Sequence, residues 1–130
     1  MSVLAVIPVA VNIGRSDLIV RDIVGASALA RTVAHIREDL PHATVVVASD
    51  DGAVLEQARK LSTAPVVFER RQRGYVECLN EVLDSQRSSP DLVVTVEATH
   101  PFRPKQLLKR MVTNLSSRAS FDSIICVRAF

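Results

Sequence analysis

The sequence is poor in aromatic residues and in residues with special backbone or redox chemistry. Its 130 residues include no tryptophan, one tyrosine, four phenylalanines, four glycines and two cysteines. Cys78 and Cys126 lie far apart, without the CxxC or Cys/His spacing of metal and redox sites, so we expect two buried free thiols. Gly14 stands alone after the first apolar run, which excludes the GxGxxG fingerprint of dinucleotide-binding domains.

Long apolar runs and a strong excess of one charge are absent too. The formal net charge is +2, too small for a nucleic-acid-binding face, and only Arg70, Arg71 and Arg73 cluster. No apolar stretch approaches the roughly 20 residues that span a bilayer, and the run at 3–11 has neither a basic leader nor a cleavage site. We therefore expect a cytoplasmic chain that binds neither membranes nor nucleic acid.

The composition that remains is that of a folded protein. Hydrophobic residues make up 48% of the chain and charged residues 23%, a balance typical of globular domains and unlike that of disordered segments. At this length the chain can build one core but hardly two. We predict one domain over residues 1–130.

Two hydrophobic periods alternate along the chain. Short apolar, β-branched runs predict strands at 3–8, 44–48, 65–68, 91–96 and 122–127. Spacings of three and four residues predict helices between these strands. Ser27 is the expected N-cap of the first helix, and Asp50 and Asp51 supply the turn and cap before the second. The helical spacing of the third begins at Tyr75, and Pro104 is expected in the first turn of the fourth. The alternation predicts an α/β fold, a Rossmann-like, mostly parallel sheet of about five strands with helices on both faces.

Ligands of such sheets bind beyond the carboxyl ends of the strands. The segments to consider are therefore the long loop at 9–25 and the shorter ones at 49–51, 69–74 and 97–103. A phosphoacceptor receiver domain is excluded because the first strand ends in Ile7, Pro8 and Val9 instead of the acidic residues that hold its magnesium ion.

Acidic and histidine residues give weaker indications. Asp50 and Asp51 could bind Mg²⁺, but helix capping accounts for them more simply, so no metal ligand is assigned. His100 could act as an acid or base, yet the sequence identifies no partner for it. His35 and His42 are expected at the surface, and no catalytic residue is predicted.

Several segments together carry a resemblance to a known family. They are Ala5-Val6-Ile7-Pro8, Gly25 before a helix with Thr32-Val33, Ala48-Ser49-Asp50-Asp51, Glu69-Arg70, Thr99-His100-Pro101-Phe102-Arg103 and Phe121-Asp122-Ser123. In order and spacing they resemble the nucleotide-binding half of nucleotide-sugar cytidylyltransferases, especially the acylneuraminate type. The motif ending at Arg103 also resembles erythritol-phosphate cytidylyltransferases, so the superfamily is better supported than the substrate.

The resemblance implies a function and a set of site residues. The chain would use CTP and a sialic-acid-like sugar acid to make a CMP-sugar and pyrophosphate, with Mg²⁺ as cofactor. Arg70 would contact the cytosine or ribose of the nucleotide, and the acceptor would meet Glu97, Thr99 and Arg103. In the long loop, the groups able to bind phosphate oxygens are those of Asn12, Arg15, Ser16 and Arg21.

The chain also departs from the family pattern. The phosphate loop of the family contains Arg, Gly, Ser and Lys, where this chain has one glycine and a degenerate sequence at 9–17, a reduced set of small and cationic residues. The second half of the family, which supplies metal-binding acids, acceptor contacts and a dimer interface, is absent from these residues. The chain is thus either a piece of a longer, homodimeric enzyme or a shortened, noncatalytic module with a regulatory or assembly role.

Overall fold

The computed structural model describes residues 2–10, 19–23, 25–98, 103–117 and 123. Three strand–helix pairs of the predicted alternation, six elements in all, precede the fourth predicted strand, which is followed by one more helix. The elements in chain order are β1 (Val3–Val9), β2 (Asp22–Ile23), β3 (Ala26–Ser27), α2 (Ala28–Asp39), β4 (Thr44–Ser49), α3 (Gly52–Lys60), β5 (Val66–Glu69), α4 (Tyr75–Asp84), β6 (Leu92–Thr95) and α5 (Leu107–Ser117).

The main sheet has four described strands in the order β5-β4-β1-β6, and every pairing is parallel. Val6 of β1, for example, lies opposite Val46 of β4 on one side and Thr95 of β6 on the other. The predicted parallel α/β sheet is therefore confirmed. Of the predicted fifth strand at 122–127, only Ser123 lies within the described residues, and that strand stays a prediction.

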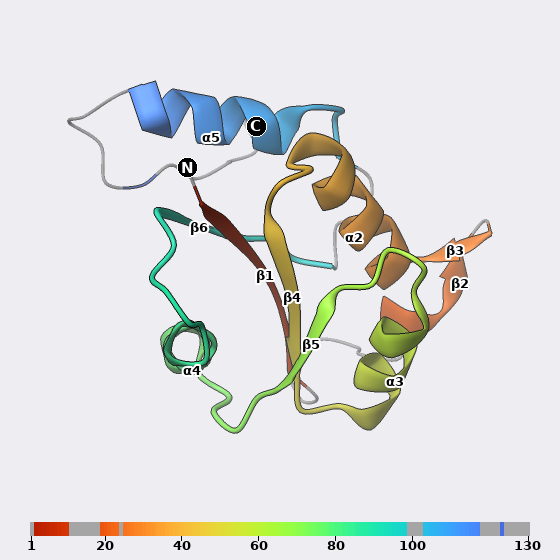
Figure 1. Ribbon diagram of the computed structural model, residues 1–130. Helices are drawn as coiled ribbons and strands as arrows, with labels where there is room; N and C mark the ends of the chain where they lie inside the picture. The colour runs from red at the N-terminus through yellow and green to blue at the C-terminus, as the bar shows by residue number, and fades with distance from the viewer. Residues whose placement is uncertain (1, 11–18, 24, 99–102, 118–122, 124–130) are drawn as a thin grey trace, which may run out of the picture.

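Strand β1 is buried on both of its faces. Ala5 and Ile7 belong to a core with residues of α2, α3 and α5, whereas Leu4 and Val6 pack with residues of α4. Figure 1 shows the same division, with α4 by itself on one side of the sheet and α2 and α3 on the other. Because successive strand residues point to opposite faces, this continuous apolar run requires helices on both sides, as predicted.

Helix α4 leaves part of its sheet face uncovered. Val66 of β5 and Val93 of β6 lie in register with Val46 and Leu4, so their side chains share the α4 face. They are nevertheless 50% and 39% exposed, and Val76 on α4 itself is 61% exposed. Apolar side chains therefore remain at the surface on this face.

Two of the predicted helix caps are confirmed by hydrogen bonds. The Oγ of Ser27 accepts from the backbone N–H of Ala30 at 3.0 Å, and the Oδ1 of Asp51 accepts from that of Ala53 at 2.9 Å. Each bond satisfies one of the N–H groups that a helix leaves unpaired at its start. Helix α2 ends one residue before Leu40, next to the predicted stop at Pro41.

The predicted loop at 9–25 contains more structure than expected. β2 and β3 form a small antiparallel sheet in which Asp22 lies opposite Ser27. Gly25 makes the turn at φ +92°, where a side chain would be strained, and its N–H donates to Asp22 Oδ1 at 2.8 Å. Two-residue strands have no hydrophobic period, so the sequence pattern did not indicate them.

The start of α5 and the position of His35 correct two further expectations. Pro104 is not in the first helical turn, because Gln106 has φ +64° and α5 begins only at Leu107. His35 is not a surface residue, since its side chain is 12% exposed and its Nε2 lies 3.3 Å from Asp39 Oδ2. The later start of α5 and the burial of His35 both involve contacts with the same buried carboxylate.

That carboxylate belongs to Asp39, at the end of α2. It is 4% exposed, and its oxygens accept from the backbone N–H groups of Gln106 and Leu108, each at 3.1 Å. A negative charge at a helix N-terminus also interacts favourably with the helix dipole. Asp39 therefore attaches the start of α5 to the end of α2.

Replacing Asp39 with alanine should lower the free energy of unfolding by about 1–3 kcal/mol, because two N–H groups lose their acceptor in a buried place. Urea unfolding followed by circular dichroism measures the change. Glu38→Ala, at the exposed neighbouring position, is the matched control and should change stability little. Equal stability of Asp39→Ala and wild type would contradict this account of α5.

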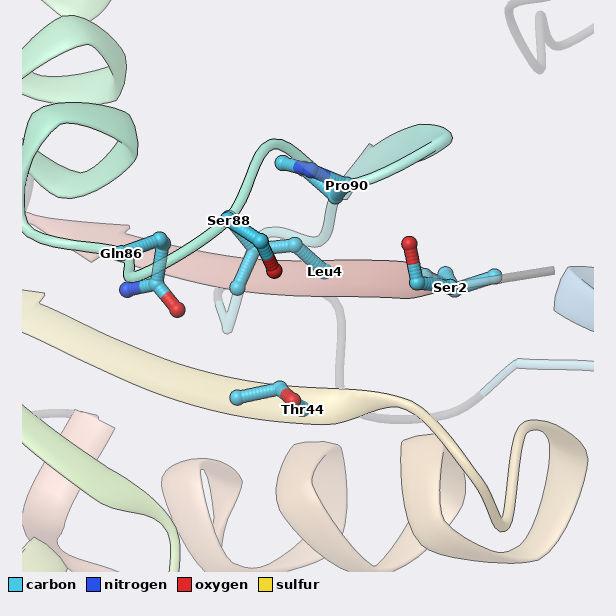
Figure 2. A pocket seen from close by; sticks show the side chains of 7 residues that line it. Ser2, Leu4, Thr44, Gln86, Ser88 and Pro90 are labelled. Atoms are coloured by element: carbon cyan, nitrogen blue, oxygen red, sulfur yellow. The ribbon is translucent and has the colours of Figure 1, made fainter.

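At the amino edge of the sheet, Asp91 connects the starts of β1 and β6. Its Oδ2 accepts from the backbone N–H of Ser2 at 2.7 Å, and its own N–H donates to the carbonyl of Ser2 at 2.9 Å. A small hollow of about 90 Å³ lies beside this contact, lined in part by Thr44 and Gln86 (Figure 2). The Ser2 N–H, followed by the Ser2 hydroxyl, lowers the pKa of Asp91 below its usual value.

The lowered pKa of Asp91 gives stability a defined pH dependence. The folded state favours the carboxylate, so the contribution is complete above the unfolded pKa of about 3.9 and is lost as the pH falls through the lower folded pKa. Asp91→Asn should therefore show a shallower loss of melting temperature between neutral pH and pH 3 than the wild type. Parallel curves for the two proteins would contradict the contact.

Candidate functional site

The candidate site lies at the carboxyl edge of the sheet, where β1 is the point at which the strand order reverses. From β1 the chain adds β4 and β5 on one side and then β6 on the other, and ligands of open α/β sheets bind at such a point. The segments at 11–18 and 99–102, which follow β1 and β6, lie outside the described residues. They contain four predicted site residues: Asn12, Arg15, Ser16 and Thr99.

The two strands beside β1 end at different heights at the carboxyl edge of the sheet. Strand β4 runs in register to the end of β1, with Ser49 opposite Val9, but the last registered pair of β6 is Thr95 with Val6. One more hydrogen bond, from Val96 N–H to the Val6 carbonyl at 3.0 Å, closes that side. At about 3.3 Å per residue, β6 therefore stops roughly 10 Å before the end of β1.

Arg70, which follows β5, is folded into its own loop. It is only 5% exposed, and its guanidinium donates to the carbonyls of Gln72 and Arg73, both at 2.7 Å, and of Gly74 at 3.3 Å. The backbone N–H of Arg70 donates to the Ser49 carbonyl at 3.0 Å, which ties the loop to the end of β4. Its predicted contact with a nucleotide stays a prediction, and the described contacts occupy Nε and one terminal nitrogen.

Glu81 of α4 holds the same loop from the other side. Its carboxylate accepts from the N–H of Arg71 at 3.1 Å through both oxygens and from that of Gln72 at 2.5 Å. The side chains of Arg71, Gln72 and Arg73 are exposed. The loop thus turns its backbone inward to Arg70 and Glu81 and its basic side chains outward.

Asp50 and Asp51 follow β4, and each has a protein partner. Asp51 caps α3, as predicted, and Asp50 Oδ2 lies 3.4 Å from Arg73 Nε. Nowhere in the described ranges do three or more His, Cys, Asp or Glu side chains form a group that could hold a metal ion. Asp50 and Asp51 thus have partners within the protein, and magnesium stays a prediction of the resemblance.

Cys78 lies in the core next to these charged groups. It is fully buried, as predicted, while Cys126 lies outside the described residues. Burial raises the pKa of the Cys78 thiol; the charge of Arg70 opposes this rise, and Glu81 and Asp50 add to it. The thiol is therefore neutral and unreactive at physiological pH.

Two predicted acceptor-binding residues, Glu97 and Arg103, contact each other beyond β6. One terminal nitrogen of Arg103, Nη2, donates to the backbone carbonyl of Glu97. The other, Nη1, is buried without a hydrogen-bond partner in the described structure. Burial lowers the pKa of Arg103, with Glu97 opposing the shift. Nearby, the Tyr75 hydroxyl of α4 donates to Thr95 Oγ1 at 2.5 Å.

Arg21, the remaining described candidate, is exposed just before β2. Its segment is held by Gln57 of α3, whose Nε2 donates to the Val20 carbonyl at 2.8 Å and whose Oε1 accepts from Ser27 Oγ at 2.7 Å. The structure therefore brings Glu97 and Arg103 together, while Arg21 and Arg70 have separate surroundings. Sequence reasoning missed Gln57 and Glu81, because no local pattern indicates which backbone groups outside its helix a side chain will bind.

Comparisons with known proteins bear on the fold. No protein-family model matches the chain, and no curated protein matches it. A solved structure of CMP:2-keto-3-deoxy-manno-octonic acid synthetase complexed with CTP superposes with a TM-score of 0.76 at 17% sequence identity. The match covers 90% of this chain and 48% of the synthetase chain.

This chain has the fold of that synthetase. The likeness agrees with the predicted nucleotidyltransferase-like α/β architecture, and the chain spans about half the length of the synthetase it matches. No helix among the described residues is both long and apolar enough to cross a membrane.

Loss of the Gln57 contacts should loosen the segment that carries Arg21. In Gln57→Ala, the Val20 carbonyl and the Ser27 hydroxyl lose their partner, which costs about 1 kcal/mol per hydrogen bond. Trypsin should then cleave after Arg21 faster than in wild type, as followed by mass spectrometry of the first fragments. Glu56→Ala, at the exposed neighbouring position, is the control, and equal cleavage rates in both variants would refute the role of Gln57.

Proposed function

We propose that this chain is the nucleotide-binding half of a cytidylyltransferase that transfers CMP from CTP to a sialic-acid-like sugar acid. The observation that carries the proposal is the fold shared over 90% of the chain with a synthetase that was solved with CTP. Independent support comes from the sequence motif that ends at Arg103 and follows the strand beside the point where the strand order reverses. Fold alone does not define chemistry, so the proposal depends on this agreement.

The proposed reaction is a single displacement at phosphorus. The anomeric hydroxyl oxygen of the sugar acid forms a bond to the α-phosphorus of CTP. The bond from that phosphorus to the oxygen bridging the β-phosphate breaks, and pyrophosphate leaves. The hydroxyl proton passes to a base, a role to which no residue of this chain is assigned.

The basic residues of the carboxyl edge would bind the nucleotide. Arg15 and Arg21, together with Asn12 and Ser16, would meet phosphate oxygens, because guanidinium groups bind phosphate through paired, charge-assisted hydrogen bonds. A magnesium ion would supply positive charge to the departing pyrophosphate. It would enter bound to the phosphates of CTP, because Mg²⁺ in such sites takes much of its coordination from substrate phosphates and water.

Glu97 and Arg103 would lie on the acceptor side, with Thr99 between them in the sequence. The contact between Arg103 and the Glu97 backbone holds the two ends of this segment together. The terminal nitrogen Nη1 of Arg103, which has no partner among the described residues, is a donor that suits the carboxylate of a sugar acid.

Calorimetric titration with CTP and magnesium chloride tests the nucleotide step. The full chain should bind CTP saturably. Arg15→Ala and Arg21→Ala should each weaken binding at least about tenfold, since a hydrogen bond to a charged group contributes about 1.5–3 kcal/mol. Arg59→Ala removes an exposed arginine of α3 that pairs with Glu56 and should bind as wild type does.

Acceptor choice is tested by pyrophosphate release with N-acetylneuraminate and with 2-keto-3-deoxy-manno-octonic acid. Release with the first acid alone supports the sialic-acid-like acceptor, and release with the second alone replaces it by the shorter acid. No binding heat at millimolar CTP would exclude the enzyme and leave the noncatalytic module, which the degenerate sequence at 9–17 favours.

A further inference from the structure

The loop at 70–74 is held by groups that the proposed chemistry does not use. Arg70 fills its inner side with hydrogen bonds to three carbonyls, and Glu81 accepts both of its first N–H groups after Arg70. These residues come from the loop itself and from the second turn of α4. The N–H groups of residues 70–72 and the carbonyls of residues 72–74 are thereby paired within the protein.

Such pairing lowers the entropy of the loop before any ligand arrives. An unsupported loop loses backbone conformational entropy when a ligand orders it, whereas a preformed loop does not. The support also decides which side chain is available. Arg70 points its guanidinium inward, Arg73 pairs with Asp50 at 3.4 Å, and Arg71 is exposed.

Arg71 is the basic group of this loop that remains for a ligand. Its backbone N–H is held by Glu81, but its guanidinium makes no hydrogen bond or ion pair within the described part of the chain. Its backbone position is fixed while its side chain is not. An anchored arginine of this kind suits an anionic ligand at the carboxyl edge of the sheet.

We infer that Glu81 is a positioning residue, which holds the backbone of the loop so that Arg71 contacts the bound nucleotide. The inference rests on the proposed function and assigns Arg70 the supporting role inside the loop. In this inference the carboxylate of Glu81 promotes the binding of an anionic nucleotide. A general charge effect would have the opposite sign, because removal of an acidic residue favours an anion.

The first measurement compares Glu81→Gln with Asp84→Asn in the full chain. Both variants remove one negative charge from α4, but Asp84 is exposed at the end of the helix and makes no hydrogen bond to the loop in the described part of the chain. Amide hydrogen exchange should show faster exchange at Arg71 and Gln72 in Glu81→Gln only. CTP affinity should fall about tenfold in Glu81→Gln and stay unchanged or rise in Asp84→Asn.

A double-mutant cycle then separates positioning from a general loss of stability. Arg71→Ala should weaken CTP binding about tenfold, and adding Glu81→Gln to it should weaken binding little further, because coupled residues are not additive. If Glu81→Gln fails to fold, Glu81→Asp, which keeps the charge but shortens the side chain, takes its place in the cycle. Additive losses would overturn the inference.

The outcomes distinguish this inference from the proposed function. If wild type does not bind CTP, the proposed function fails and the inference fails with it. If wild type binds CTP while Glu81→Gln loses amide protection and keeps its affinity, only the inference fails. Loss of affinity in Glu81→Gln, with Asp84→Asn unchanged and a non-additive cycle, supports both.

Discussion

The burial of β1 on both faces is the constraint on which the rest of this structure depends. Its apolar side chains need helices on either side, and both of its edges are hydrogen-bonded to parallel strands. Parallel strands need long connections that cross the sheet, so each connection delivers a loop to the carboxyl edge. A short apolar run near the start of the chain therefore determines where basic loops from distant parts of the sequence gather.

Single polar side chains then hold what the hydrophobic core leaves loose. Gln57, Glu81 and Asp39 each lie on a helix, and each makes hydrogen bonds to the backbone of a segment outside that helix. Gln57 also accepts from the Ser27 hydroxyl and Asp39 lies against His35, but the backbone contacts are the ones that set the course of the chain.

Hydrophobic periodicity predicted the parts of the fold that rest on burial, and it could not predict the parts that rest on individual contacts. The strands at β1, β4, β5 and β6 and the caps at Ser27 and Asp51 follow from local chemistry. The antiparallel pair of β2 and β3, and the delayed start of α5, depend on Gly25 and on Asp39, whose partners are set by the tertiary structure. At the candidate site, the resemblance implied that Arg70 contacts the nucleotide, whereas its contacts within the loop emerge only from the folded chain.

The incomplete cover of the α4 face has a consequence for the colloidal behaviour of the chain. Val66, Val76 and Val93 are exposed apolar side chains on that side, and the strands that carry two of them are the outermost of the four described strands. Exposed apolar groups on outer strands promote edge-to-edge association. Crowding or high concentration will therefore act on this face first, and a charged substituent at Val66 or Val93 would oppose precipitation there without altering the opposite core.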